Sequence, residues 1–239
     1  MKKRLDILLA ELGFVDSRKK ASDLIKEKKV FVDGVIVEKP SKEFFGNEKI
    51  EITEVLKYVS RAGLKLEGAH KEFNFNIKDK VVADIGSSTG GFTDFLLQNG
   101  AKKVYAIDVG TGQLAEKLKN DDRVISLEKT DIRNLFELPE KVELAVVDVS
   151  FISLELILLS VTKLLKNKVE IILLVKPQFE VGRENISKGG IVKDEKAKIF
   201  SLEKIKSFAQ KLGLEIRGEA VSPIKGGDGN EEYFLYLVR

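Results

Sequence analysis

The sequence predicts an α/β protein: a doubly wound, mostly parallel, seven-stranded Rossmann-like sheet, preceded by a small α+β unit. Two observations support this prediction. From residue 81 onward, apolar runs fit for buried strands alternate with amphipathic stretches of helical period, which is the pattern of repeated βαβ units. Before residue 60, two short helices precede several short strands. A chain of 239 residues is long enough for two such domains.

The small α+β unit is predicted from residues 1–55. Residues 4–12 place leucines at helical spacing, and Gly13 fits the stop position that follows a helix. A second helix begins near Asp16 or Ser17, either of which can cap it. Residues 30–37 predict two short strands about an Asp33-Gly34 turn, and residues 49–52 predict a last strand. Residues 56–60 are predicted to be a linker.

The large domain is predicted from residues 61–239. Residues 61–69 predict a helix, and the glycine-rich segment after residue 85 follows the first strand. The last two strands are separated only by a loop, so they are expected to form an antiparallel hairpin at the end of the sheet. The seven predicted strands are residues 81–85, 103–108, 123–127, 142–149, 169–176, 214–221 and 232–238.

Composition excludes several classes of function. The chain has no cysteine and a single histidine, His70, so disulfides, thiolate metal sites and zinc catalysis are not expected. No apolar run approaches the ~18 residues of a membrane-spanning helix. Asp6 and Glu11 interrupt the segment that would have to serve as a signal peptide, so the expected location is the cytoplasm. Residues 1–30 hold nine basic and five acidic side chains, a basic excess that suits phosphate.

The glycine loop after the first predicted strand is suited to a nucleotide-like ligand, because strand, glycine loop and helix follow in that order. Gly86, Ser88 and Gly91 occupy the glycine positions of the dinucleotide fingerprint, so the middle glycine is missing. Asp84 would repel a pyrophosphate but suits a ligand with a cation and free hydroxyls, such as S-adenosylmethionine. The alternative is a tight turn without a ligand. The predicted cofactor-binding residues of this stretch are Asp84, Gly86, Ser87, Ser88, Thr89, Gly90, Gly91 and Phe92.

Further charged residues follow the other predicted strands. Asp108 is placed to accept hydrogen bonds from ribose hydroxyls, and Asp131 to serve an adenine amino group. Each of these carboxylates alone could be a helix cap or a loop residue. Asp148 and Lys176 end two apolar strands, where charges are costly unless they pair or serve a ligand. The two are expected to lie close together, either at a reactive centre or as a structural ion pair.

Residues 1–55 resemble the small RNA-binding domain named after ribosomal protein S-four. The resemblance implies that the basic second helix docks on structured RNA through phosphate contacts; a merely solvated lysine face is the alternative. Lys29 and Asp33 depart from the residues that this family often has there. The predicted RNA-binding residues are Arg4, Ser17, Arg18, Lys19 and Lys20. The resemblance rests on Arg4-Leu5-Asp6, Leu8-Leu9, Gly13, Ser17-Arg18, Ala21, Leu24-Ile25, Val30, Val32, Gly34, Val37 and Lys39-Pro40-Ser41.

Residues 61–239 resemble an FtsJ/RrmJ-type ribose 2′-O-methyltransferase domain, and the full chain resembles the TlyA family, some of whose members are called haemolysins. The segments that carry the resemblance surround Lys65, Asp148, Lys176 and Glu232, with support from residues 188–194 and 222–224. Ala62 replaces a glycine that is common in the family. The resemblance implies that these four residues form a Lys-Asp-Lys-Glu catalytic tetrad, that S-adenosylmethionine is the cofactor, and that the substrate is a cytidine ribose in small- or large-subunit ribosomal RNA.

The residue types of this tetrad suit the chemistry. A ribose 2′-hydroxyl is a weak acid, so it must be oriented and relieved of its proton while it attacks. We assign the proton-accepting role to Lys176, the orientation of Lys176 to Asp148, and the positioning of the hydroxyl to Lys65 and Glu232. Two alternatives remain at this point: a non-catalytic RNA-binding assembly factor, and a pore-forming protein.

Overall fold

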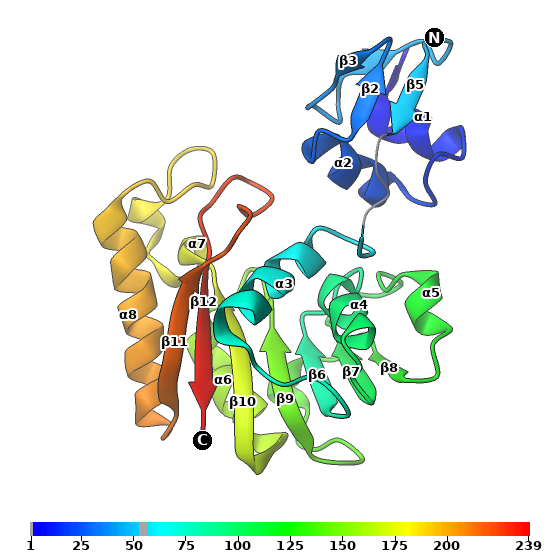
Figure 1. The fold of residues 1–239 in the computed structure, drawn as a ribbon. Coiled ribbons are helices and arrows are strands. Elements are labelled where there is room, and N and C mark those ends of the chain that lie inside the picture. Colours follow the sequence, from blue (N-terminus) through cyan, green and yellow to red (C-terminus); the bar gives the residue numbers. More distant parts are fainter. Residues whose placement is uncertain (1, 53–56) are drawn as a thin grey trace. The chain divides into compact units, whose positions relative to one another are not determined.

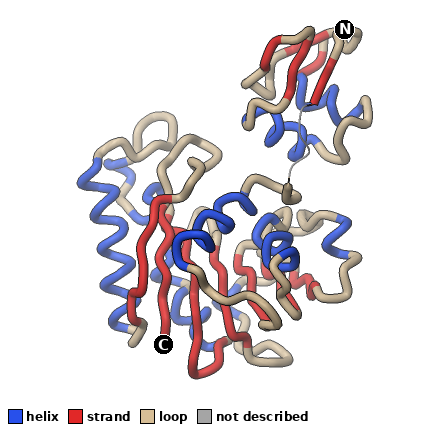
Figure 2. Tube along the Cα trace, viewed as in Figure 1, coloured by secondary structure: helices blue, strands red, loops and turns tan. Residues whose placement is uncertain are grey.

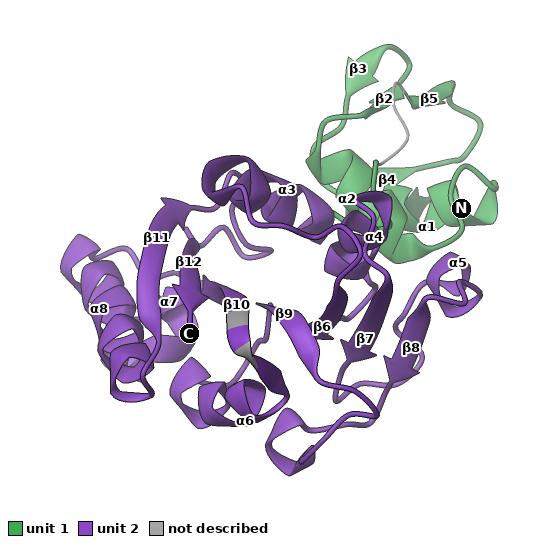
Figure 3. Cartoon of the chain, turned by 60° about the horizontal axis from the view of Figure 1, so that its bottom comes forward, with its two compact units in different colours: residues 1–61 green, residues 62–239 purple. Residues whose placement is uncertain are grey.

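The computed structural model describes residues 2–52 and 57–239, and these fall into two compact units, residues 1–61 and 62–239 (Figure 3). Residue 56 of the predicted linker, residues 56–60, lies outside the described residues. Residues 53–55 of the first predicted domain also lie outside them. The division into 1–55 and 61–239 therefore stays a prediction.

Unit 1 packs two short helices, α1 and α2, against a small sheet. The strands β2 and β3 meet at Asp33 and Gly34, whose φ values of 50° and 76° are those of a two-residue hairpin turn. Ser17 rather than Asp16 caps α2, because its hydroxyl accepts the N–H of Lys20. A second pair of strands, β1 and β4, was not predicted. The elements are β1 Lys3–Arg4, α1 Leu5–Glu11, α2 Arg18–Lys26, β2 Val30–Val32, β3 Val35–Ile36, β4 Glu43–Phe44 and β5 Ile50–Ile52.

Unit 2 is built on a seven-stranded sheet with the order β11-β12-β10-β9-β6-β7-β8 (Figures 1 and 2). Five neighbouring strands run parallel, and β12 runs antiparallel to both β10 and β11. This confirms the predicted parallel sheet and its terminal hairpin. The strands are β6 Val81–Ile85, β7 Lys103–Ile107, β8 Val124–Leu127, β9 Val142–Val147, β10 Leu165–Val175, β11 Glu215–Val221 and β12 Tyr233–Val238.

Helices cover both faces of this sheet. Figures 1 and 3 show α3, α4 and α5 on one face and α6 and α8 on the other. Apolar side chains such as Ala83, Val147 and Leu173 are therefore fully buried, as a parallel sheet requires. The helices are α3 Ala62–Phe73, α4 Gly91–Gln98, α5 Glu116–Lys119, α6 Leu158–Lys163, α7 Pro177–Glu180 and α8 Glu195–Lys211, with the single 3-10 turns η1 Ile132–Asn134, η2 Leu154–Leu156 and η3 Arg183–Asn185.

The strand order indicates where a ligand crevice is expected. The chain starts the sheet at β6, adds β7 and β8 on one side, and then crosses to add β9 and β10 on the other. The connections after β6 and β9 therefore leave in opposite directions. In open sheets of this kind, ligands bind outside the carboxyl ends of the strands at such a switch point.

Candidate active site

The glycine loop begins directly after β6 at this switch point. Gly86 has a φ of +85°, and a Cβ built on it would lie 2.4 Å from the backbone oxygen of Asp148. Only glycine fits there, because both the backbone conformation and the space exclude a side chain. Gly90, with a φ of +92°, begins α4 against Leu114 and Leu118. The glycines thus bring the loop close to the end of β9.

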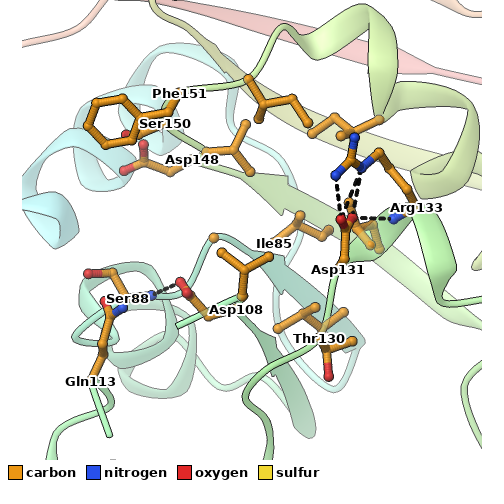
Figure 4. A pocket seen from close by; sticks show the side chains of 17 residues that line it. Ile85, Ser88, Asp108, Gln113, Thr130, Asp131, Arg133, Asp148, Ser150 and Phe151 are labelled. Atoms are coloured by element: carbon orange, nitrogen blue, oxygen red, sulfur yellow. Dashed lines mark hydrogen bonds and ion pairs between the residues drawn. The ribbon is translucent and has the colours of Figure 1, made fainter. Parts of the chain in front are cut away.

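A cavity of about 460 Å³ opens between the loop and the ends of β6, β7 and β9. Figure 4 shows Asp108 and Asp148 on either side of it, with Asp131 on a third side. Of the predicted residues, five line it: Gly86, Ser88, Asp108, Asp131 and Asp148. The volume lies in the range of small-molecule and cofactor sites.

Asp108 shapes one wall of the cavity. Its carboxylate accepts the backbone N–H of Ser88 at 2.8 Å and that of Gly110 at 2.7 Å. Each oxygen accepts one of these bonds, so each keeps a lone pair for a further donor. The carboxylate is fixed by the glycine loop and remains able to accept ligand hydroxyls.

Asp131 is held differently. Both of its oxygens accept hydrogen bonds from the guanidinium of Arg133, between 2.6 and 3.0 Å, as drawn in Figure 4. These bonds keep the pKa of Asp131 below its usual value. The predicted adenine contact would therefore have to share this carboxylate with Arg133, a partner that sequence analysis missed although it is only two residues away.

Asp84 lies beneath the loop rather than on the cavity wall. Its side chain is fully buried, and one oxygen accepts the Thr93 hydroxyl at 2.6 Å while the other has no partner among the described residues. Burial raises the pKa of Asp84 to about 7, and the nearby charges of Asp148 and Asp108 act in the same direction. A buried carboxyl with an unused oxygen is a group that a cationic ligand or a proton would stabilise.

The other predicted loop residues lead into α4 or begin it, and they do not line the cavity. Phe92 is buried and packs against Phe234 of β12, with ring centroids 6.4 Å apart. Ser87, Thr89, Gly90 and Gly91 also lie outside the lining. The wall includes several residues that the sequence analysis did not select, among them Gln113, Thr130, Val149, Ser150 and Phe151.

At the end of β10, Lys176 meets Asp148. The Lys176 ammonium lies 2.6 Å from the Asp148 carboxylate and donates to the Ser150 hydroxyl at 2.9 Å. Both charged side chains are largely buried. The predicted proximity of this pair is thus observed, and Ser150 is an additional partner.

Lys65 on α3 forms a second buried pair with Glu232, at 2.5 Å. The register of β10 and β12 pairs Val175 with Tyr233, so the residues that follow and precede them, Lys176 and Glu232, end adjacent strands at the same edge of the sheet. The chain therefore assembles two lysine–carboxylate pairs from residues up to 167 positions apart at this edge. Of these four residues, only Asp148 lines the cavity. Because a buried ion pair contributes little net stability, two such pairs at one edge of the sheet, one of them reaching the cavity wall, point to chemistry.

The predicted RNA-binding residues gather at one end of unit 1. Arg4 and Arg18 both donate to the buried carboxylate of Asp6, at 2.8 to 3.2 Å, while their own side chains stay substantially exposed. Burial alone would raise the pKa of Asp6, but the bonds from Arg4 and Arg18 outweigh it and lower that pKa. Ser17 begins α2, and Lys19 and Lys20 follow in its first turn. Asp6 thus presents two guanidinium groups together.

Comparisons with known proteins agree with this architecture. Residues 58–239 match the model of the FtsJ-like methyltransferases, and residues 3–44 match that of the S4 domain. The chain is 40% identical to the 16S/23S rRNA (cytidine-2′-O)-methyltransferase TlyA of Mycobacterium tuberculosis, over 98% of this chain and 89% of that protein. It is 43% identical to Hemolysin A of Brachyspira hyodysenteriae, over 98% and 99%.

Solved structures show the same fold. A Streptococcus thermophilus protein with a hemolysin-type name superposes with a TM-score of 0.80 at 42% identity, over 100% of this chain and 88% of that one. The S-adenosylmethionine-dependent methyltransferase of Mesorhizobium loti shares the fold of unit 2 with a TM-score of 0.54 at 13% identity, over 73% of this chain and 98% of that one. Within residues 2–52 and 57–239, no helix is both long and apolar enough to cross a bilayer. The chain belongs to the TlyA family, in which an S4 domain is joined to an FtsJ-like methyltransferase domain.

Proposed function

We propose that the protein transfers a methyl group from S-adenosylmethionine to the 2′-hydroxyl of a cytidine in ribosomal RNA. The observation that carries this proposal is the pairing of Lys176 with Asp148 and of Lys65 with Glu232 at one edge of the sheet, with Asp148 on the wall of the cavity. The relative from Mycobacterium tuberculosis, a 16S/23S rRNA (cytidine-2′-O)-methyltransferase, supports the substrate class.

The residues around the cavity fit the proposed methyl donor. Gly86 lets the loop approach Asp148 more closely than any side chain allows. Asp108 keeps lone pairs for ribose hydroxyls, and the unused oxygen of Asp84 lies beneath the loop where a positive charge would be favourable. When bound, the donor would supply an activated methyl group. We therefore propose that Asp84, Asp108 and Asp131, with loop residues 86–92, form the donor site.

Lys176 is the proposed acceptor of the hydroxyl proton. Its Nζ lies against the Asp148 carboxylate and donates to the Ser150 hydroxyl, and we propose that it also faces the ribose hydroxyl. After losing its own proton, Lys176 would use the lone pair of its Nζ to accept the proton of the attacking 2′-hydroxyl. Asp148 and Ser150 fix the direction of that lone pair. Lys65 and Glu232 would hold the hydroxyl in line for attack.

Unit 1 is proposed to anchor the RNA. Arg4 and Arg18 on Asp6, with Ser17, Lys19 and Lys20 at the start of α2, offer charges that contact phosphates without selecting a sequence. We also propose that residues 1–55 and 61–239 are the two domains, joined at 56–60, and that the protein works in the cytoplasm, where ribosomal subunits are found.

The test is a methyl-transfer assay with labelled S-adenosylmethionine and purified ribosomal subunits, followed by mapping of 2′-O-methylation along the RNA. We expect incorporation at a cytidine ribose. Incorporation on a base or on protein, or none with either subunit, would contradict the proposal. Subunits from cells that lack this protein serve as the substrate, because their target hydroxyls are unmodified.

A further inference from the structure

A buried carboxylate that the mechanism does not use lies one short helix beyond Lys176. Glu180 ends α7 and is 6% exposed. One of its oxygens accepts the Ser153 hydroxyl at 2.6 Å, and the other accepts the backbone N–H of Leu154 at 2.8 Å. Glu180 thereby fastens α7 to the segment 148–154, which carries Asp148 and Ser150 to the cavity.

The same two segments are also joined at their other ends. Lys176, just before α7, contacts Asp148 and Ser150, while Glu180, at the end of α7, contacts Ser153 and Leu154. The contacts of Lys176 and those of Glu180 therefore join the same two stretches of chain, residues 176–180 and the segment 148–154, at two separate points. A shift of the segment at one end would change the geometry at the other.

The segment between these two contacts is strained. Phe151 has a φ of +65°, which is unfavourable for any residue with a side chain, and 90% of its surface is exposed. Its ring contacts that of Phe179 on α7, with centroids 5.1 Å apart. An exposed residue in a strained conformation persists only where its surroundings hold it, and such strain is concentrated at functional sites.

Lys204 of α8 compensates the charge of Glu180. Its Nζ lies 3.3 Å from the carboxylate and 3.1 Å from the backbone oxygen of Glu180, and 3.1 Å from the half-buried Glu155. Burial raises the pKa of Glu180, although these hydrogen bonds oppose the rise. The carboxylate is thus kept in an unfavourable environment by partners at the start of η2 and on α8.

We propose that Glu180 is a positioning residue for methyl transfer: it holds the segment 148–154 so that Asp148 and Ser150 meet Lys176. The proposal rests on the proposed function, because it assigns a role through Lys176. Glu180 touches neither cavity nor substrate, so its effect is expected on turnover rather than on binding.

Glu180→Gln tests this role. The amide must place an NH₂ group either against the Leu154 N–H or against Lys204, so one of the contacts is lost. We expect kcat to fall by about 10- to 100-fold, in line with the cost of displacing catalytic groups by an ångström, while the KM values for RNA and S-adenosylmethionine stay within about threefold. Ser153→Ala removes one of the two bonds that join Glu180 to the segment, together with the longer bonds that the Ser153 hydroxyl accepts from the Glu155 N–H and Lys204, without changing the charge. It should lower kcat by a smaller factor, and it also serves if Glu180→Gln folds poorly.

Two controls separate positioning from general stability. Glu155→Gln removes the other carboxylate partner of Lys204 without touching the segment, and its kcat should remain within about twofold of the parent. Ser150→Ala removes one of the groups that Glu180 is inferred to place, so Glu180→Gln should cost at least about threefold less in that background than in the parent. Thermal unfolding and calorimetric binding of S-adenosylhomocysteine establish that each variant is folded.

The outcomes distinguish the two proposals. A parent protein without turnover on ribosomal RNA would overturn both. A parent with normal turnover whose Glu180→Gln and Ser153→Ala variants keep their kcat would overturn the role of Glu180 alone. The role would also be overturned if Glu155→Gln lowered kcat equally, or if the effects of Glu180→Gln and Ser150→Ala multiplied as independent factors.

Discussion

At the scale of single residues, variants of Lys176 and Asp148 can distinguish a contribution to stability from a contribution to activity. Removing one member of a buried ion pair leaves the other charge uncompensated, whereas removing both is often neutral. Lys176→Gln should therefore lower the free energy of unfolding by about 3 kcal/mol and kcat by about 100-fold or more. Lys176→Gln combined with Asp148→Asn should recover most of the stability and none of the kcat, as measured by urea unfolding and the methylation assay.

Lys163→Gln is the matched control, since Lys163 lies on α6 with its side chain exposed. It should leave both quantities unchanged. Recovery of turnover in the double variant would show that Lys176 contributes only to stability, and the assignment of proton transfer to Lys176 would be wrong.

Asp84 predicts a dependence of stability on pH. Its pKa is raised from the ordinary value of 3.8 to about 7, mainly by burial. Between these values the folded protein holds a proton that the unfolded chain releases, so this group lowers stability as pH rises through that window. Asp84→Asn cannot ionise. Relative to the parent, the variant should gain more than about 1 kcal/mol of unfolding free energy between pH 5.5 and pH 8.

The measurement is urea unfolding of both proteins at the two pH values. Comparing variant with parent removes the contribution of Glu180, whose pKa is also raised by burial. Thr93→Val is a useful second change, because it deletes the hydroxyl that donates to Asp84, which should raise the pKa of Asp84 further and steepen the pH dependence. A parent and an Asp84→Asn variant with parallel pH profiles would exclude an elevated pKa.

Individual residues could be predicted where the features that identify them lie close by in the sequence. Asp84, Asp108 and Asp148 were found because each follows a short apolar run, and the end of such a run is visible in a few letters. Glu180 was missed because its partners lie 26 residues upstream and 24 downstream. The bond of Arg133 to Asp131 spans two residues, and the spacing of opposite charges could have revealed it.

At the scale of elements, the close approach of the glycine loop to β9 can be tested by substituting Gly86, with Gly112 as the control. Gly86→Ala places a Cβ against the Asp148 backbone, which cannot move without shifting β9. Gly112 also has a positive φ, +65°, but a Cβ there meets nothing within 4 Å. Gly112→Ala should cost about 1 kcal/mol for the left-handed backbone, and Gly86→Ala at least about 1 kcal/mol more. Only Gly86→Ala should abolish calorimetric binding of S-adenosylhomocysteine; equal effects of both variants would refute the close approach.

The elements themselves were predicted best where the pattern is long. All seven strands of the large sheet were expected, the central ones because strands buried on both faces are continuously apolar. The edge strand β11 has no buried residue and was expected from its place in a hairpin with β12. The strand β10 begins at Leu165, four residues before its predicted start, since polar residues there extend it at the edge of the apolar run and its pairing with β9 is irregular. The two-residue strands β1 and β4 carry no periodicity and depend on each other for pairing.

At the scale of the whole molecule, the residues proposed to bind RNA and those proposed to catalyse methyl transfer lie in different units. Substitutions in the two sets should therefore change different kinetic constants. The basic start of α2 lies in unit 1, and the lysine–carboxylate pairs lie in unit 2. Lys19→Gln with Lys20→Gln should therefore raise the KM for ribosomal subunits and leave kcat within about twofold. The dependence of log affinity on log salt concentration should weaken by about 0.7 to 0.9 for each phosphate contact removed.

The opposite end of the same helix supplies the control. Lys26→Gln with Lys28→Gln removes the same charge from the last turn of α2 and the residues after it, and in each pair one lysine has an acidic partner, Asp16 for Lys20 and Glu38 for Lys28. If RNA is held by phosphate contacts at the start of α2, only the first double variant changes the salt dependence. Equal changes in both would mean that net charge alone attracts the RNA, because long-range attraction does not distinguish the two ends of a nine-residue helix. A lowered kcat in the first variant would instead show that RNA contacts in unit 1 also set the geometry at Lys176.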